Sequence, residues 1–83
     1  METLEKVRAI LRDTLSLGDR ANQLTLESPL LGGLAEFDSM AVVSVVTMLE
    51  DELGLTVNDD ELSADVFASV GSLVTFVDAK LRR

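Results

Sequence analysis

The sequence predicts an all-α fold, a small bundle of three main helices plus one short helix, with a long loop after the first helix. Three apolar stretches with helical spacing support this class, one near each end of the chain and one in the middle. With 83 residues, of which 47% are apolar, the chain fits a single domain over residues 1–83. A domain of this size has a thin core, which leaves no room for a buried catalytic cavity.

The first helix is predicted near the N-terminus, where charged residues separate apolar ones that keep a helical spacing: Leu4, Val7, Leu11 and Leu15. Gly18 is expected to end it. Residues 17–37 then include Pro29 and two adjacent glycines and keep no sustained period. A connection this long is uncommon in a compact domain unless it is functional. We expect it to pack on the core through its apolar residues: Leu24, Leu26, Leu30, Leu31, Leu34 and Phe37.

The second helix is predicted over residues 39–53. Its β-branched residues would also allow a strand, but the run is longer than an ordinary strand and its apolar residues keep helical spacing. Ser39 is a suitable N-cap, and Gly54 stands where a helix often ends in a left-handed residue. Met40 is expected in the core or at its rim. Most of the other apolar side chains are expected in the core: Val42, Val43, Val45, Val46 and Leu49.

Residues 64–68 follow an acidic turn and are predicted to form the short helix, with Val66 or Phe67 buried. The final helix is predicted to begin after Ser69, a suitable N-cap. Its apolar stripe is Val70, Leu73, Val74, Val77 and Leu81. Its basic end suits the negative pole of a helix dipole: Lys80, Arg82 and Arg83.

The net charge is strongly negative and unevenly placed. Fifteen Asp and Glu residues against seven Lys and Arg give −8, and no base occurs between Arg20 and Lys80. Such a surface repels a phosphate backbone, so we expect no nucleic-acid partner and favour basic protein surfaces. The N-terminus lacks signal-peptide features, and no apolar run approaches the roughly 20 residues that cross a bilayer. We therefore expect a cytoplasmic protein without membrane insertion.

The chain has neither cysteine nor histidine, which excludes disulfides, thiol nucleophiles and zinc sites built from these residues. Catalysis by Ser39 would need a base, and the only lysines, Lys6 and Lys80, belong to terminal helices with apolar stripes. The acidic turn at 58–61 lacks the glycine and the spaced glutamate of an EF-hand. We expect no catalytic residues, no metal site and no enzyme activity.

Ser39 has two interpretations. Its position alone favours a helix cap, but a phosphodiester at a helix N-terminus would also meet free N–H groups and the positive pole of the dipole. Asp38-Ser39-Met40 follows a long loop and begins an apolar helix, and an acidic turn ending in Gly54-Leu55 and the run Ser69-Val70-Gly71-Ser72-Leu73-Val74 come later. In this order and spacing, over essentially the whole chain, the sequence resembles the acyl carrier protein family in its stand-alone bacterial form.

The resemblance implies that a phosphopantetheinyl transferase esterifies Ser39 with 4′-phosphopantetheine from coenzyme A. The thiol of this arm would carry acyl groups as thioesters from one enzyme to another. In the family, the acid at the position of Asp38 helps the transferase to engage the site, and partners contact the hydrophobic residue at the position of Met40. The family also shelters acyl chains between helices, which here implies an apolar interior formed with Val66, Phe67, Val74 or Val77.

The acidic residues of the second helix and the following turn have a plain interpretation as a solvated face. The resemblance implies that they meet basic docking patches on acyl-loading and acyl-accepting enzymes: Glu50, Asp51, Asp59 and Asp60. Contacts of this kind form fast, weak and salt-sensitive complexes, which suits a shuttle. We expect the carrier to be a monomer.

The sequence departs from the family pattern around the second helix. Phe37 stands where the family often has glycine, and Ala41 and Ser44 stand where carriers of fatty acid synthesis tend to have acids. We interpret this as a specialised carrier of an accessory lipid or secondary pathway. Residues 29–40 are also similar to carriers found with bacterial exosortase and exopolysaccharide systems. Two alternatives stay open, an aminoacyl carrier of the D-alanyl type and an unmodified acidic helical interaction module in which Ser39 is only a cap.

Overall fold

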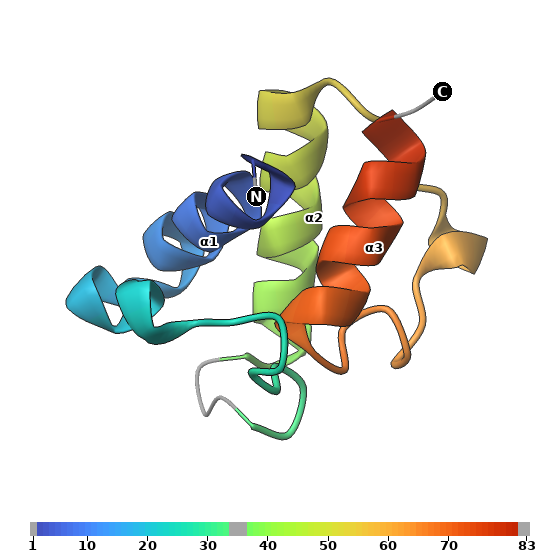
Figure 1. Cartoon of the computed structure of the whole chain (residues 1–83). Coiled ribbons are helices and arrows are strands. Elements are labelled where there is room, and N and C mark those ends of the chain that lie inside the picture. The colour runs from blue at the N-terminus through green and yellow to red at the C-terminus, as the bar shows by residue number, and fades with distance from the viewer. Residues whose placement is uncertain (1, 34–36, 82–83) are drawn as a thin grey trace.

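The protein is described by a computed structural model over residues 2–33 and 37–81. These residues form three α-helices and two short 3-10 helices: α1 (Glu2–Leu15), η1 (Gly18–Gln23), α2 (Ser39–Leu53), η2 (Asp59–Glu61) and α3 (Val70–Leu81). α2 and α3 run in the same direction, and α1 packs against both of them (Figure 1). The predicted all-α bundle with a long connection after the first helix is confirmed.

The core lies where the three α-helices meet and draws on both long connections as well. α1 buries an apolar stripe at the predicted spacing. α3 does so with Val70, Leu73, Val74 and Val77, but Leu81, the last residue of its predicted stripe, is 39% exposed, so that part of the prediction was wrong. The side chains that are 0–1% exposed come mostly from these helices: Val7, Leu11, Leu30, Val45, Leu49, Val70, Leu73 and Val77. Among the described residues no polar or charged residue is buried, so apolar burial is the main source of stability.

α1 ends three residues earlier than its glycine suggests. Its last residue is Leu15, Ser16 follows with a φ of 56°, and the N–H of Leu17 donates to the carbonyl of Arg12 at 3.0 Å. This bond closes a Schellman motif in which serine takes the left-handed position that glycine usually fills. The prediction that Gly18 ends the helix was therefore wrong, and Gly18, with a φ of 57°, begins η1 instead.

The connection between α1 and α2 is packed down, as predicted, but only in part. Leu24, Leu30 and Phe37 are buried, whereas Leu26 and Leu31 are each 42% exposed, and Leu34 lies outside the described residues. Residues 26–31 form a strap along the start of α3. Backbone hydrogen bonds of 2.8–3.0 Å hold this strap on both sides of Pro29: Leu30 to Ala68, Leu31 to Phe67, Val70 to Ser28 and Gly71 to Leu26.

α2 spans the predicted residues, Ser39–Leu53, and Gly54 caps its end with a φ of 68°. Its apolar residues divide into two groups. Val45, Val46 and Leu49 are buried, as predicted. Val43, at 61% exposed, is the exception among the side chains predicted for the core, and Met40 is 76% exposed, so the prediction that Met40 lies in the core or at its rim was wrong. Helical periodicity explains the division, because a single helix face meets the bundle and the run is apolar all round.

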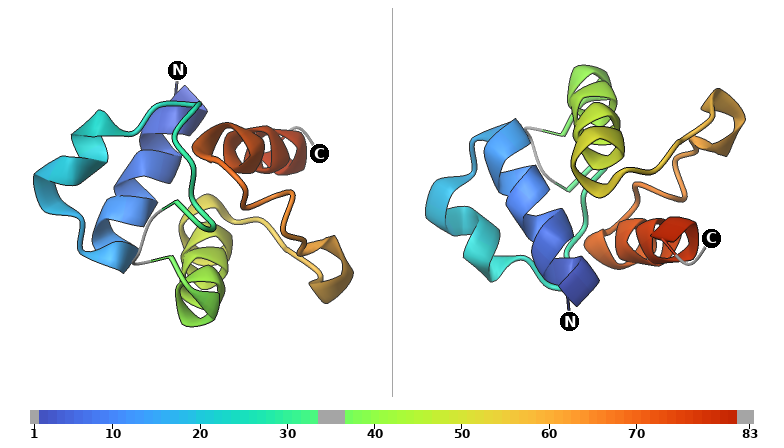
Figure 2. Two further views of the ribbon diagram at one scale, coloured as in Figure 1. Left: turned by 90° about the horizontal axis from the view of Figure 1, so that it is seen from below. Right: turned by 90° about the horizontal axis from the view of Figure 1, so that it is seen from above.

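The segment between α2 and α3 stands out from the side of the bundle (Figure 2). The short helix was predicted at residues 64–68, but those residues form turns, and the short helix lies earlier, at η2. Phe67 is nevertheless buried, as predicted, with its ring centroid 5.9 Å from that of Phe37. The apolar pattern in residues 64–68 thus indicated one buried aromatic side chain, and a turn can bury that side chain as well as a helix can.

The start of α3 confirms Ser69 as an N-cap. Its hydroxyl accepts from the N–H of Ser72 at 3.1 Å, and the hydroxyl of Ser72 lies 3.0 Å from the N–H of Ser69 and accepts from it. This is a capping box with serine in place of the usual Glu or Gln. The Ser72 hydroxyl also donates to the carbonyl of Val66 at 2.8 Å, which fastens the preceding turn to the helix.

Candidate functional site at the start of α2

Ser39 is the first residue of α2 and its side chain is exposed. The cap belongs to its neighbour: Asp38 is extended, with φ −107° and ψ −171°, and its Oδ1 accepts from the N–H of Ala41 at 2.9 Å. The prediction that Ser39 is the N-cap was therefore wrong. Within residues 2–33 and 37–81 the Ser39 hydroxyl has no hydrogen-bond partner. The interaction-module alternative therefore loses the role that it gave to Ser39.

The local electrostatics suit an attached anion. The first turn of α2 contains no acidic side chain, and the carboxylate of Asp38 caps the positive pole of the helix dipole. The backbone N–H groups of a first helical turn also lack intrahelical partners and point out of the helix end. A phosphodiester on Ser39 would lie beside these groups.

An apolar groove of about 310 Å³ opens beside Ser39. Val42 of α2 forms part of one side, and the connection to α3 forms another, with Leu31 of the strap between α1 and α2 as a third contributor. Its full lining is Leu31, Ser39, Val42, Leu62, Ser63, Ala64 and Phe67. The exposed hydroxyl of Ser39 therefore lies at the edge of a space that can receive an apolar group. The residues present fit a phosphopantetheine arm with a short apolar load.

The groove differs from the apolar interior that the sequence suggested. Phe67 does line it, but Val66 does not, and Val74 and Val77, which are 2% and 0% exposed, belong to the buried core. Sequence reasoning missed Leu31, Leu62 and Ala64 as lining residues. Each of these three lies in an irregular segment without a hydrophobic period, so periodicity carried no signal for them. Only the long-range contacts of the fold bring them next to Ser39.

An uncharged face of α2 runs away from Ser39. Met40, Val43, Ser44 and Thr47 are all exposed, and their spacing of three or four residues places them on one side of the helix. The Thr47 hydroxyl donates to the carbonyl of Val43 at 2.9 Å, so it is already satisfied within the helix. An enzyme that reaches Ser39 from this side meets an apolar surface first.

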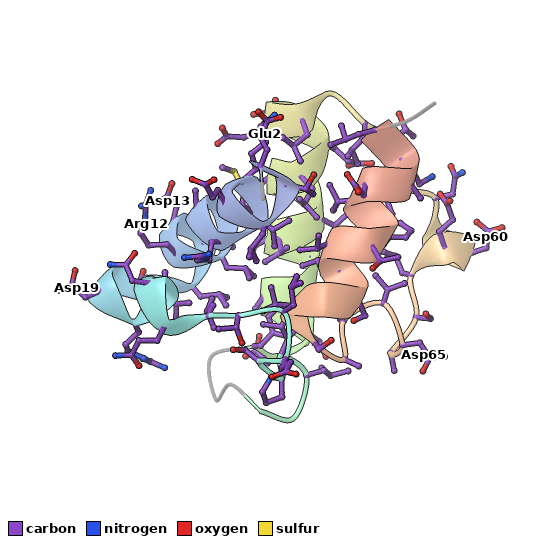
Figure 3. The ribbon with its side chains drawn as sticks, viewed as in Figure 1. Glu2, Arg12, Asp13, Asp19, Asp60 and Asp65 are labelled. Atoms are coloured by element: carbon purple, nitrogen blue, oxygen red, sulfur yellow. The ribbon has the colours of Figure 1, made fainter. Side chains whose placement is uncertain are left out.

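The acidic residues predicted to meet partners are not one patch. Glu50 is half-buried, and its Oε2 accepts from the N–H of Val57 at 2.8 Å, so it holds the chain after α2. Asp51 is exposed on the last turn of α2, about 18 Å along the helix from Ser39. Asp60 projects outward from η2 (Figure 3). The side chain of Asp59 lies outside the described part of the structure.

The described residues contain neither a metal-binding cluster nor a membrane-spanning helix. No group of three or more Asp or Glu side chains there is placed to hold a metal ion. No helix in residues 2–33 and 37–81 is long and apolar enough to span a membrane.

Comparison with known proteins identifies the family. The family model described as "Phosphopantetheine attachment site" matches residues 5–77. The chain is 31% identical to an acyl carrier protein of Thermotoga maritima over 80 residues, covering 96% of this chain and 93% of the relative. It is 32% identical to an acyl carrier protein of Petrotoga mobilis over 80 residues, covering 96% and 88%.

A solved structure agrees with both relatives. The solution NMR structure of a holo acyl carrier protein from Nitrosomonas europaea matches with a TM-score of 0.92 and 52% identity, over 100% of each chain. Sequence and fold thus lead to the same group of proteins, and the match spans the site at the start of α2. The resemblance seen in the sequence is therefore confirmed: the chain belongs to the acyl carrier protein family, whose members have a phosphopantetheine attachment site.

Proposed function

We propose that Ser39 is the residue that bears the 4′-phosphopantetheine arm. The observation that carries this proposal is the division of roles at the start of α2. Asp38 supplies the helix cap, which leaves the exposed Ser39 hydroxyl without a partner among the described residues. That hydroxyl lies at the edge of the 310 Å³ apolar groove. When bound, the arm supplies the thiol that a chain without cysteine lacks.

The size of the groove supports a short acyl load. Its volume of about 310 Å³ is at the lower end of the range for small-molecule sites. Val45, Val74 and Val77 of the core are at most 2% exposed and do not line the groove. We therefore propose that the load lies in the surface groove between α2 and residues 62–67, and that a long chain extends beyond it into solvent or into a partner enzyme.

We propose that a phosphopantetheinyl transferase and acyl-loading and acyl-accepting enzymes dock around the start of α2. An enzyme that acts on Ser39 covers on the order of 800 Å² of the carrier, which includes the uncharged face of Met40 and Val43. Asp51 and Asp60 would meet basic groups at the edge of such an interface, whereas Glu50 is committed to Val57. An apolar centre with an acidic edge differs from an acidic helix, which supports a specialised pathway rather than general fatty acid synthesis.

Three further expectations complete the proposal. We propose that the carrier acts as a cytoplasmic monomer and is not itself an enzyme, with its chemistry performed by the enzymes that dock on it. The sequence supports the last point, since it contains no His or Cys to serve as base or nucleophile. Gel filtration of the modified protein tests the oligomeric state.

The test is intact mass before and after incubation with coenzyme A and a broad-specificity phosphopantetheinyl transferase. We expect the parent to gain one phosphopantetheine and Ser39→Ala to gain none. Ser44→Ala is the matched control, because Ser44 is also an exposed serine of α2, and it should gain one arm like the parent. A folded Ser39→Ala protein that still gains the arm would refute the assignment. No gain by the parent, starting unmodified, would refute the carrier function.

A further inference from the structure

Lys80 is the only basic residue between Arg20 and Arg82, and its side chain is largely hidden from solvent. Its side chain is only 9% exposed and its Nζ forms an ion pair with Glu61, 19 residues away. The same ammonium lies 5.7 Å from the centroid of the Phe76 ring, a favourable cation–π contact. Desolvating an ion pair offsets much of its attraction, so pairs of this kind fix a conformation more than they add stability.

Glu61 connects this pair to the segment between α2 and α3. Its Oε1 accepts from the N–H of Asn58 at 2.9 Å, which closes η2 onto itself. Because the same carboxylate binds Lys80, η2 is fastened to the last turn of α3. In Figure 2, η2 stands farther from the α-helices than the rest of that segment. The ion pair therefore connects the most projecting part of the segment to α3.

The residues directly after η2 form a wall of the groove. Leu62, Ser63 and Ala64 line it opposite Val42 of α2. Beyond them the chain is fastened a second time, where Phe67 accepts from the N–H of Leu31 and Val66 accepts from the Ser72 hydroxyl. Between the two fastenings, the N–H of Val66 donates to Ser63 and the N–H of Ala68 donates to the carbonyl of Asp65, and both bonds stay within this segment. The wall is thus a short span held at its two ends.

We propose that Lys80 is a positioning residue for the groove: through Glu61 it sets how close residues 62–64 lie to α2, and so how much of a load on Ser39 the groove shelters. This inference rests on the proposed function of Ser39. Lys80 itself does not line the groove; it borders a separate hollow with Leu53, Gly54, Leu55, Thr56 and Leu81. Its influence on the load is transmitted through the ion pair.

The test compares Lys80→Met with two controls. Methionine keeps an unbranched apolar stem against Phe76 and removes the charge, whereas Lys80→Arg keeps the charge and should restore the parent behaviour. Lys6→Met makes the same chemical change at the exposed Lys6–Glu2 pair, where N and O are 3.7 Å apart on the surface. Each protein is loaded with a broad-specificity transferase from acetyl-coenzyme A or octanoyl-coenzyme A, and loading is checked by intact mass.

The readout is the difference in melting temperature between the octanoyl and the acetyl forms of each protein. We expect this difference to be at least halved in Lys80→Met and unchanged in Lys80→Arg and Lys6→Met. A purely structural role would lower the melting temperature of both loaded forms equally and leave the difference intact, which would overturn the inference. The inference would also be overturned if the octanoyl form of the parent protein melted at no higher temperature than its acetyl form.

A second variant keeps the test decisive if Lys80→Met does not fold. Glu61→Gln retains an oxygen that can accept from Asn58 while it removes the charge that Lys80 binds, and the same halving is expected. If neither the parent nor any of the variants gains mass, the proposed function of Ser39 fails, and this result does not count against the positioning role. A loaded Glu61→Gln protein with the parent difference overturns the positioning role alone.

Discussion

The carboxylate of Asp38 accepts a hydrogen bond from the N–H of Ala41 at 2.9 Å, and this contact separates two tasks at the start of α2. Asp38 satisfies the helix end, so the next residue, Ser39, can be esterified without loss of a cap. A serine that capped the helix itself would lose that bond on modification, at a cost of about 1 kcal/mol. The separation therefore allows the unmodified and modified forms to have similar stability.

Replacing Ser39 by alanine should leave the stability of the unmodified protein almost unchanged. Its hydroxyl is exposed and has no partner in the described part of the chain, so the expected change in the free energy of unfolding is within about 0.5 kcal/mol. Urea denaturation followed by circular dichroism measures it. A loss of about 1 kcal/mol or more would mean that the serine acts as a cap after all.

Replacing Asp38 by alanine should have the opposite result. Loss of the cap is expected to lower the free energy of unfolding by about 1 kcal/mol, while Asp38→Asn keeps an acceptor and should stay close to the parent. Asp65→Ala removes an exposed acid without a cap and controls for the change in net charge. Equal stability of Asp38→Ala and Asp65→Ala would contradict the capping role.

The Asp38→Asn protein also separates the two functions assigned to this residue. If the transferase needs the negative charge, modification of Asp38→Asn should slow at unchanged stability, since the cap is retained. The rate of mass gain under fixed enzyme and coenzyme A measures this. A parent rate in Asp38→Asn would leave the aspartate with a structural role only.

The sequence predicts the helices well because their apolar residues recur at the helical period. The residue span of α2, its end at Gly54 and the Ser69 cap of α3 are confirmed, whereas the cap at the start of α2 was assigned to Ser39 and belongs to Asp38. The end of α1 was missed because Ser16, an uncommon residue for the left-handed position, takes the place expected of Gly18. The short helix was misplaced because a single buried side chain, Phe67, does not determine a helix.

Only the motif of the candidate site was predictable from the sequence. Asp38-Ser39-Met40 is a local motif, so its place at a helix start follows from the sequence. The groove depends on Leu31 and Leu62, which are brought beside Ser39 by contacts between segments far apart in the chain. The face of Met40 and Val43 was also missed, because an all-round apolar helix gives no sign of which side faces solvent.

Gly71 should not tolerate alanine. A Cβ at this position would lie 2.6 Å from the carbonyl oxygen of Leu26, and the N–H of Gly71 donates to that same oxygen at 2.8 Å. In an open helix, glycine to alanine would stabilise by roughly 0.5–1 kcal/mol, but here the clash with backbone reverses the sign. We expect a net loss of about 1–3 kcal/mol, measured by urea denaturation.

The control for Gly71→Ala is Thr75→Ala, an exposed position one turn later in α3. It should change the free energy of unfolding by no more than about 0.5 kcal/mol. A Gly71→Ala protein as stable as the parent would mean that the strap of residues 26–31 can move off α3 without cost.

The uncharged face of α2 should matter to partners and not to stability. Val43 is 61% exposed, so Val43→Asp should leave the fold intact while placing a desolvated charge in any apolar interface. We expect kcat/KM of the transferase to fall at least tenfold, equivalent to about 1.4 kcal/mol. Leu81→Asp, at an exposed apolar residue of α3, should not change it. Equal rates for both variants and the parent would exclude this face from the docking surface.

Salt should raise the melting temperature of the unmodified protein. The net charge is −8 and residues 21–79 contain no base, while Lys80, the next base along the chain, is already bound to Glu61, so the exposed acids repel one another. About 0.1 M KCl shortens the screening length to about 10 Å and should relieve most of this repulsion, as should millimolar Mg²⁺.

Asp60→Asn should melt at a higher temperature than the parent at low salt. The two melting temperatures should converge as KCl is added, because salt screens the same charge repulsion that the substitution removes. A melting temperature that stays flat across the salt series in both proteins would show that self-repulsion does not limit the stability of this fold.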